Sequence, residues 1–267
     1  MEAKSVNFKQ AKGIKSAFLV ILCCFILAVC IFHFVLGNPA NFMNNDPNNH
    51  PLPGNMLGTI YKGGVIVPVI QTLLLTVLVL SIERAFAIGK AKGKGNVVKF
   101  VKNVKDALNG GDVEKARVKQ KGSVASVVYS ALTKYEEMEK DTTLAKDQKL
   151  MNIQKELDEA TALELPTLEQ NLVVIATMTT LGTLTGLLGT VIGMIKSFAA
   201  LANAGSPDSV ALSAGISEAL VNTAFGIATG ALAVISYNYF TSKIDKLTYS
   251  IDEVGFTIVQ TYAATHK

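Results

Sequence analysis

Long apolar stretches alternate with polar segments along this chain of 267 residues. Four stretches carry at most one Asp, Glu, Lys or Arg each. Each is long enough to cross a membrane, since about 20 residues at ~1.5 Å rise per residue span the ~30 Å hydrocarbon core. The pattern predicts an all-α membrane protein with four transmembrane helices, of which the last two are long and extend into a cytoplasmic helical bundle. The predicted spans are residues 16–36, 65–83, 171–202 and 209–240.

The first apolar stretch also resembles a signal peptide, because four lysines precede it. Its apolar core, however, exceeds the roughly 7–15 residues of a signal sequence, and no cleavage site of small residues follows. We therefore interpret this stretch as a retained transmembrane helix.

The distribution of basic residues predicts the orientation, because loops rich in Lys and Arg stay in the cytoplasm. Four precede the first span, one lies in the first loop, sixteen separate the second and third spans, none lies in the last turn and three follow the fourth span. Both termini are therefore expected in the cytoplasm. The cytoplasmic parts are an arm (1–15), a helical domain (84–170) and a C-terminal helix (241–267); a loop (37–64) and a turn (203–208) lie on the opposite side.

Helical patterns fill the large cytoplasmic segment. An amphipathic stripe predicts a first helix, which Asn109-Gly110-Gly111 ends, and Asp112 is placed to cap the next one. Another helix is expected over 123–139, and a long one from about residue 142 runs directly into the third span, with Pro166 as a candidate kink. The stripe consists of Val97, Phe100, Val101, Val104 and Leu108.

The Asn- and Pro-rich loop of residues 37–64 is expected to lack regular structure. Composition excludes several other features. All three cysteines lie in the first span, so neither a disulfide framework nor a Cys-based metal site is predicted. The net charge of +4 follows the membrane topology and does not indicate nucleic-acid binding. Since no nucleophile–base set, metal cluster or cofactor motif is present, we expect neither an enzyme nor a cofactor.

Small residues form stripes on the last two spans. In the third span glycines recur at spacings of four, three and four, and the fourth span repeats the device. Such stripes allow two helices to approach closely in a membrane. We therefore expect the two spans to pack along Gly182, Gly186, Gly189, Gly193, Gly215, Gly226 and Gly230.

Glu218 is the most informative residue of the chain, because a carboxylate in an apolar span costs several kcal/mol unless it is protonated, paired or hydrated. We therefore favour a functional role for Glu218 over a purely structural hydrogen bond. Asn222 lies one turn further along the same helix face, with Thr223 beside it. Thr183 and Thr190 belong to a hydroxyl-bearing face of the third span. Alternatively, these hydroxyls bond the backbone of their own helices, and the sole role of Asn222 is to join two helices.

An antiparallel hairpin of the last two spans would place residues at the same depth when their numbers add up to roughly 410. Thr190 then lies between Glu218 and Thr223 in depth, so a carboxyl, an amide and two hydroxyls share one layer. The Glu218 carboxyl in this layer can take up and release a proton. Residues 65–82 and the other three spans contain no second carboxylate, so we expect a further titratable group on another chain. Lys196 is expected to reach toward water or to bind an anionic partner.

Two motifs resemble the MotA/TolQ/ExbB proton-channel family, with ExbB as the best match. They are G-L-L-G-T-V-I-G-M-I from Gly186 and G-I-S-E-A-L-V-N-T-A-F-G-I-A from Gly215, followed by Tyr237-Asn238. The resemblance implies a subunit of the bacterial inner membrane that forms a pentamer around an ExbD-like single-span partner, whose helix carries an aspartate. It further implies work on a TonB-like protein, driven by the proton-motive force, and contact with membrane lipids. Glu218, Thr190 and Thr223 match the family's pore residues.

The chain departs from the family pattern at three places. Gly182-Thr183 replaces an Ala-Pro pair, Leu232 replaces a proline, and the first span is additional to the three-span ExbB plan. The four-span arrangement is closer to MotA. A TolQ-, MotA- or gliding-type stator therefore stays an alternative within the class, and a non-conducting membrane scaffold is the alternative from another class.

Overall fold

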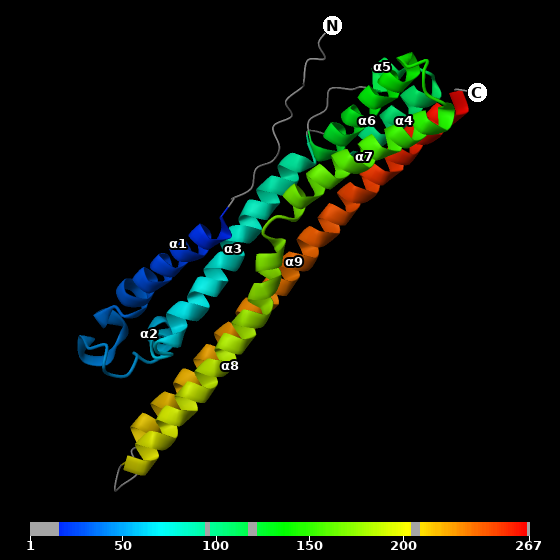
Figure 1. The fold of residues 1–267 in the computed structure, drawn as a ribbon. Coiled ribbons are helices and arrows are strands. Elements are labelled where there is room, and N and C mark those ends of the chain that lie inside the picture. Colours follow the sequence, from blue (N-terminus) through cyan, green and yellow to red (C-terminus); the bar gives the residue numbers. More distant parts are fainter. Residues whose placement is uncertain (1–15, 94–96, 117–121, 204–208, 266–267) are drawn as a thin grey trace. The chain divides into compact units, whose positions relative to one another are not determined.

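The computed structural model describes residues 16–93, 97–116, 122–203 and 209–265. The expected N-terminal arm of residues 1–15 lies outside the described residues, as does the turn from residue 204 to 208. Figure 1 shows the course of the helices along the chain. The chain divides into two compact units. We call Ser16–Ile82 with Asn171–Asn238 the apolar unit, and Glu83–Gln170 with Tyr239–Lys267 the charged unit.

The predicted all-α membrane fold is confirmed. Helices make up nearly all of the described segments, which contain no named strand. Four helical stretches are long and apolar enough to cross a membrane: Ala17–Leu36, Ile66–Ala91, Lys146–Ala202 and Val210–Thr265. The apolar unit contains α1 (Ala17–Cys30) with a π-helical continuation (Ile31–Leu36), α2 (Met56–Tyr61), most of α3 (Ile66–Ala91), α8 (Leu172–Asn203) and the first part of α9 (Ser209–Thr265).

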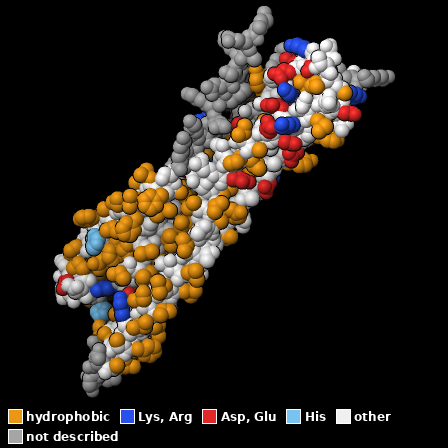
Figure 2. All heavy atoms as spheres, in the orientation of Figure 1, with side chains coloured by type: hydrophobic (Ala, Val, Ile, Leu, Met, Phe, Trp, Pro, Cys, Tyr) orange, Lys and Arg blue, Asp and Glu red, His pale blue; other side chains and the backbone are white. Residues whose placement is uncertain are grey.

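The apolar unit exposes large hydrophobic side chains to a degree that water would penalise. Phe18, Phe34 and Val173 are each about three-quarters exposed (75%, 76% and 75%). Figure 2 shows hydrophobic side chains over much of the visible surface of the apolar helices, while acidic and basic side chains gather around α4 to α7. Surfaces of this kind are stable in hydrocarbon, which fits the assignment as a membrane protein.

The first loop is more ordered than its composition suggested, so that expectation was wrong. It contains two 3-10 turns and α2. The Asn41 side chain donates to the carbonyl oxygens of Val35 (2.8 Å) and Leu36 (3.0 Å), which lack partners in the ending helix. Asn55 donates to Asn41 (3.1 Å) and also caps α2 by accepting from the Gly58 amide (3.1 Å). Asparagine here completes the hydrogen bonding of helix ends.

The charged unit contains the helices predicted for it. They are α4 (Val97–Asn109), α5 (Val113–Ala116), α6 (Ser123–Lys140) and α7 (Lys146–Glu169). All five residues of the predicted α4 stripe are buried, and Asp112 caps α5 by accepting from the Lys115 amide at 2.9 Å. The last part of α9 adds buried residues at spacings of three and four: Phe240, Ile244, Leu247, Ile251, Val254, Ile258 and Tyr262.

The long helix does not run unbroken into the third span, and Pro166 does not end it. The helix α7 continues through Pro166 to Glu169, and Asn171 then adopts a left-handed conformation (φ 64°), which ends helices. The fully buried Arg84 guanidinium donates to the carbonyl oxygens of Thr167 (3.3 Å) and Leu168 (3.2 Å). These carbonyls belong to the last turn, so Arg84 replaces the partners that a continuing helix would supply.

The glycine stripes form the contact between α8 and α9. A Cβ atom added to Gly226 would lie 2.6 Å from the Cα of Gly186 and 2.7 Å from the carbonyl oxygen of Gly182. The paired numbers 186 and 226 add up to 412, close to the depth rule of roughly 410. The seven predicted glycines would each meet atoms of the facing helix if they carried a side chain.

Replacing Gly226 with alanine is expected to destabilise the hairpin by roughly 1–3 kcal/mol, because the added methyl group must push two backbones apart. Gly89→Ala is the matched control, since a Cβ atom on this helical glycine meets nothing within 4 Å. That change should stabilise the helix by up to about 1 kcal/mol. Unfolding of both variants in detergent, followed by circular dichroism, tests the difference. Equal stability of the two variants would contradict the close contact.

Candidate functional site

The single carboxyl in the fourth span is paired within its own subunit. The Lys196 ammonium on α8 lies 2.6 Å from Oε1 of Glu218 on α9. The two partners differ in exposure, because Glu218 is only 7% exposed whereas the Lys196 side chain is 51% exposed. Lysine had been expected to reach water or bind an external anion; the structure gives it Glu218. The numbers 196 and 218 add up to 414, so the depth rule contained the signal for this pair.

The Glu218 carboxyl also lies against the backbone that precedes α3. A Cβ atom added to Gly64 would lie 2.5 Å from Oε1 of Glu218 and 3.5 Å from Nζ of Lys196. Gly64 has a φ of +72°, so glycine is required both for the backbone conformation and for the space. The amino end of a helix carries a partial positive charge, which stabilises a nearby carboxylate. Sequence reasoning missed this contribution of Gly64, for which the Gly63-Gly64 pair is the only signal.

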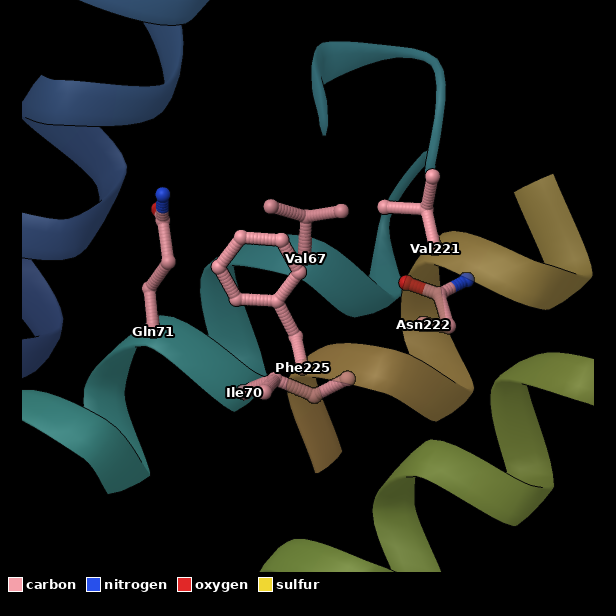
Figure 3. A pocket seen from close by; sticks show the side chains of 6 residues that line it. All are labelled: Val67, Ile70, Gln71, Val221, Asn222 and Phe225. Carbon is pink, nitrogen blue, oxygen red and sulfur yellow. The ribbon is translucent and has the colours of Figure 1, made fainter. Parts of the chain in front are cut away.

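Asn222 connects α9 to the same segment. Its side chain is 1% exposed, and its Nδ2 donates to the carbonyl oxygen of Gly63 at 2.8 Å. Its Oδ1 is buried and has no hydrogen-bond partner among the described residues. Figure 3 shows Asn222 on α9 near the segment that leads into α3, beside a pocket to which Val67 and Phe225 contribute. The expected role of Asn222 in joining helices therefore has a defined partner, and one of its polar atoms stays available.

The two predicted pore threonines contact each other across the hairpin. The hydroxyls of Thr190 and Thr223 are within hydrogen-bonding distance, and they also reach the carbonyl oxygens of Gly186 (3.3 Å) and Ala219 (3.1 Å) in their own helices. Two hydroxyl protons are thus shared among three contacts. Thr183 bonds the carbonyl oxygen of Thr179 (3.1 Å) in its own helix. The hydroxyls are therefore close together, and each has a local acceptor.

The expected polar layer consists of two sets of contacts. Thr190 lies with Thr223, while Glu218 and Asn222 are directed to Lys196 and to the segment before α3. Glu218 and Thr223 are five residues apart on one helix, which separates their directions by about 140°. The carboxyl and the hydroxyls thus occupy similar depths but different sides of α9.

Few other charged groups belong to the apolar unit. In its described part, the ionisable residues besides the pair are His33, Asp46, His50, Lys62, two tyrosines (Tyr61 and Tyr237) and the three cysteines. The Lys62 ammonium donates to the carbonyl oxygens of Pro47 (2.8 Å) and Asn48 (3.1 Å) in the loop. Burial lowers the pKa of Lys62, and the nearby Asp46 raises it in part. Lys62 is therefore committed to the loop, and Lys196 is the cation observed on Glu218.

Comparison with known proteins gives a consistent result. The MotA/TolQ/ExbB proton channel family matches residues 120–253, a segment that includes both sides of the hairpin and excludes Gly63 and Gly64. The Tol-Pal system protein TolQ of Pseudomonas aeruginosa is 27% identical over 191 residues, which cover 67% of this chain and 81% of the relative. An ExbB-like biopolymer transport protein of Synechocystis is 35% identical over 88 residues, or 32% of this chain and 42% of that protein.

Replacing Gly64 with alanine should displace the Glu218 carboxyl, because the new methyl group would occupy the position next to Oε1. Gly54→Ala is the matched control: Gly54 also has a positive φ (+78°), but nothing lies within 4 Å of its added Cβ atom. Both variants carry the same type of backbone strain of about 1–2 kcal/mol. Only Gly64→Ala should lower the yield of the amide cross-link that a water-soluble carbodiimide forms between the native Lys196 amine and the Glu218 carboxyl, measured by mass spectrometry. Equal yields in the two variants would show that Gly64 does not position the carboxyl.

Proposed function

Because the chain belongs to the MotA/TolQ/ExbB proton channel family, we propose that it is the ExbB-type subunit of a motor that energises import through an outer membrane. The proton-motive force drives such a motor. The subunit acts as a proton-responsive stator component in the bacterial inner membrane. The observation that carries the proposal is the buried Glu218, because it is the one carboxyl that the described helices carry within the apolar unit.

The chemistry of the proposal follows from the surroundings of Glu218. A carboxylate removed from water is stable only with compensating charge or dipoles, and Lys196 and the amino end of α3 supply both. Proton uptake neutralises the carboxyl and removes the reason for the contact with Lys196. Binding and release of one proton therefore change the forces between α8, α9 and the segment before α3. Such a change can be converted into relative motion of helices.

The partners in this proposal follow from the family and from the exposed surface. Relatives act together with ExbD- or TolR-type proteins. We assign to this chain a homopentamer that surrounds single-span ExbD-like helices carrying an aspartate, with a TonB-like protein as the recipient of the work. The exposed apolar side chains of α8, such as Val191 (55%) and Ile195 (62%), suit contact with neighbouring helices or with lipids.

The topology in this proposal follows from the lysine distribution. Residues 1–15, the charged unit and the end of α9 lie in the cytoplasm, and the loop with α2 lies in the periplasm with the turn after α8. Gly63, Gly64, Lys196 and Glu218 then lie in the outer half of the membrane, because Lys196 is near the end of α8 that leads to the periplasmic turn. Glu218 would receive protons from the periplasmic side, which is the side of higher proton concentration.

A TolQ-type motor is the second candidate, supported by the Pseudomonas aeruginosa relative that covers 67% of this chain. The two functions share the stator and differ in the protein that receives the work. A deletion strain separates them, since loss of iron–siderophore uptake indicates the ExbB type, whereas loss of outer-membrane integrity with normal uptake indicates the TolQ type.

Replacing Glu218 with alanine or glutamine should abolish energised uptake, because no described group can replace the missing carboxyl. The purified complex should keep its size, since Gln fills the same space. Glu253→Gln is a matched control on the same helix, where the side chain is exposed in the charged unit. A strain with Glu218→Gln that imports iron–siderophore at the normal rate would refute the proton-binding role.

Thr190→Val and Thr223→Val are expected to reduce uptake less than loss of the carboxyl does, by several-fold. Each change removes one hydroxyl at nearly constant volume, and the remaining threonine can still bond its own helix carbonyl. Thr177→Val is the control, because its exposed hydroxyl bonds only the carbonyl oxygen of Val173 in the described contacts. Complete loss of uptake in either pore variant would show that the hydroxyls are indispensable to proton movement.

A further inference from the structure

Lys196 and Glu218 form an ion pair with unequal surroundings. The carboxyl is 7% exposed and has the Gly64 backbone beside it, whereas half of the lysine side chain (51%) is accessible. Lysine has a long flexible stem that can extend its ammonium group toward a polar boundary. Glu218 has no comparable freedom, because α8, α9 and the segment before α3 surround it. If the pair separates, the lysine is therefore the partner that moves.

Lys196 is the one counter-ion of Glu218 among the described residues. The described part of α8 carries Lys196 alone among Asp, Glu, Lys and Arg, and α3 carries none before Glu83. The loop contributes Lys62, whose ammonium bonds two loop carbonyls, together with Asp46 and His50; the π-helical turn contributes His33. None of these groups has a described contact with the Glu218 carboxyl. The charge state of Glu218 thus depends on Lys196 and on the amino end of α3.

A buried charge without its partner is strongly unfavourable. The presence of the ammonium at 2.6 Å therefore favours the carboxylate, and removal of the ammonium favours the neutral acid. The partial charge at the amino end of α3 is smaller than a full unit charge, so it cannot compensate for the loss of Lys196. The balance between the two forms of Glu218 is consequently set by the position of one side chain.

We propose that Lys196 is a positioning residue that holds Glu218 in the charged form in the resting subunit and is released each time Glu218 takes up a proton. The inference rests on the proposed role of Glu218 as the proton-binding group. In the forward step a proton from water forms an O–H bond with the carboxylate, and Lys196 keeps its own proton and leaves as an ammonium ion. In the reverse step the O–H bond breaks, the proton returns to water and the ion pair forms again. The position of the Lys196 side chain at the accessible surface of α8 therefore depends on whether the buried Glu218 carboxyl carries a proton.

Labelling with dicyclohexylcarbodiimide tests this inference, because the reagent reacts with neutral carboxyl groups in apolar surroundings. The full chain in lipid nanodiscs is treated over a range of pH, and the peptide that contains Glu218 is analysed by mass spectrometry. In the native protein, labelling should be slow near neutral pH and rise as the pH falls. Lys196→Met should label at least about tenfold faster near neutral pH, because the carboxyl has lost its counter-ion. Glu218→Gln gives the background.

Lys196→Arg separates charge from shape. Arginine keeps the positive charge and can bond a carboxylate, so its labelling profile should follow that of the native protein. An unchanged profile in Lys196→Met would overturn the inference, as would a profile of Lys196→Arg that follows the methionine variant. The same two variants should show reduced uptake for Met and substantial uptake for Arg, which links the labelling to function.

A second measurement excludes unfolding as the cause of faster labelling. Cysteines at positions 190 and 223, in a chain whose three native cysteines are replaced by alanine, should form a disulfide across the hairpin, because the two threonine hydroxyls are in contact. Labelling is then counted only in the cross-linked fraction, so loosened molecules do not contribute. If labelling responds to Lys196 but Glu218→Gln retains uptake, the counter-ion role stands and the proposed function fails. If Glu218→Gln abolishes uptake but labelling ignores Lys196, the proposed function stands and this inference fails.

Discussion

Polar groups within a membrane must find their partners inside the protein, because hydrocarbon offers none. Glu218 is the most demanding of these groups, and the surrounding structure meets its requirements from three directions. Lys196 supplies the opposite charge from α8, and Gly64 allows the carboxyl to reach the amino end of α3. The glycine stripes bring α8 and α9 close enough for both contacts. One carboxyl thus depends on segments that are far apart in the sequence.

Buried helix ends outside the spans have a related requirement, because their carbonyl oxygens also need partners within the protein. The Asn41 side chain donates hydrogen bonds to carbonyl oxygens at the end of the first membrane helix, and Arg84 does the same for the last turn of α7. The hydroxyls of Thr190 and Thr223 bond their own helices as well as each other. A polar side chain at a helix end or in a span therefore acts first as a hydrogen-bond partner, and any role in moving protons is added to that.

The sequence was sufficient to predict the spans, the glycine stripes and the depth of the contacts between α8 and α9, because these depend on periodicity and length. It predicted the α4 stripe for the same reason. Lys196 was interpreted without a partner, because a lysine near a helix end can always reach water, although the depth rule placed it within about one helical turn of Glu218. The contact of Asn222 with Gly63 joins residues 159 positions apart, and no periodicity encodes such a distance. The end of α7 depended on the left-handed Asn171, while Pro166 is the more conspicuous signal.

The energetics of buried ion pairs favour a functional explanation of Lys196 and Glu218. Such pairs contribute little net stability, because the cost of removing two charges from water offsets their attraction, and apolar replacements are often equally stable. A leucine and a methionine at these positions would pack in a membrane without that cost. Unequal exposure adds a second property, since the half-exposed Lys196 has room to move away whereas the buried Glu218 does not. In the proposed mechanism proton binding removes the charge that holds Lys196, so a contact that is a poor stabiliser is well suited to respond to a proton.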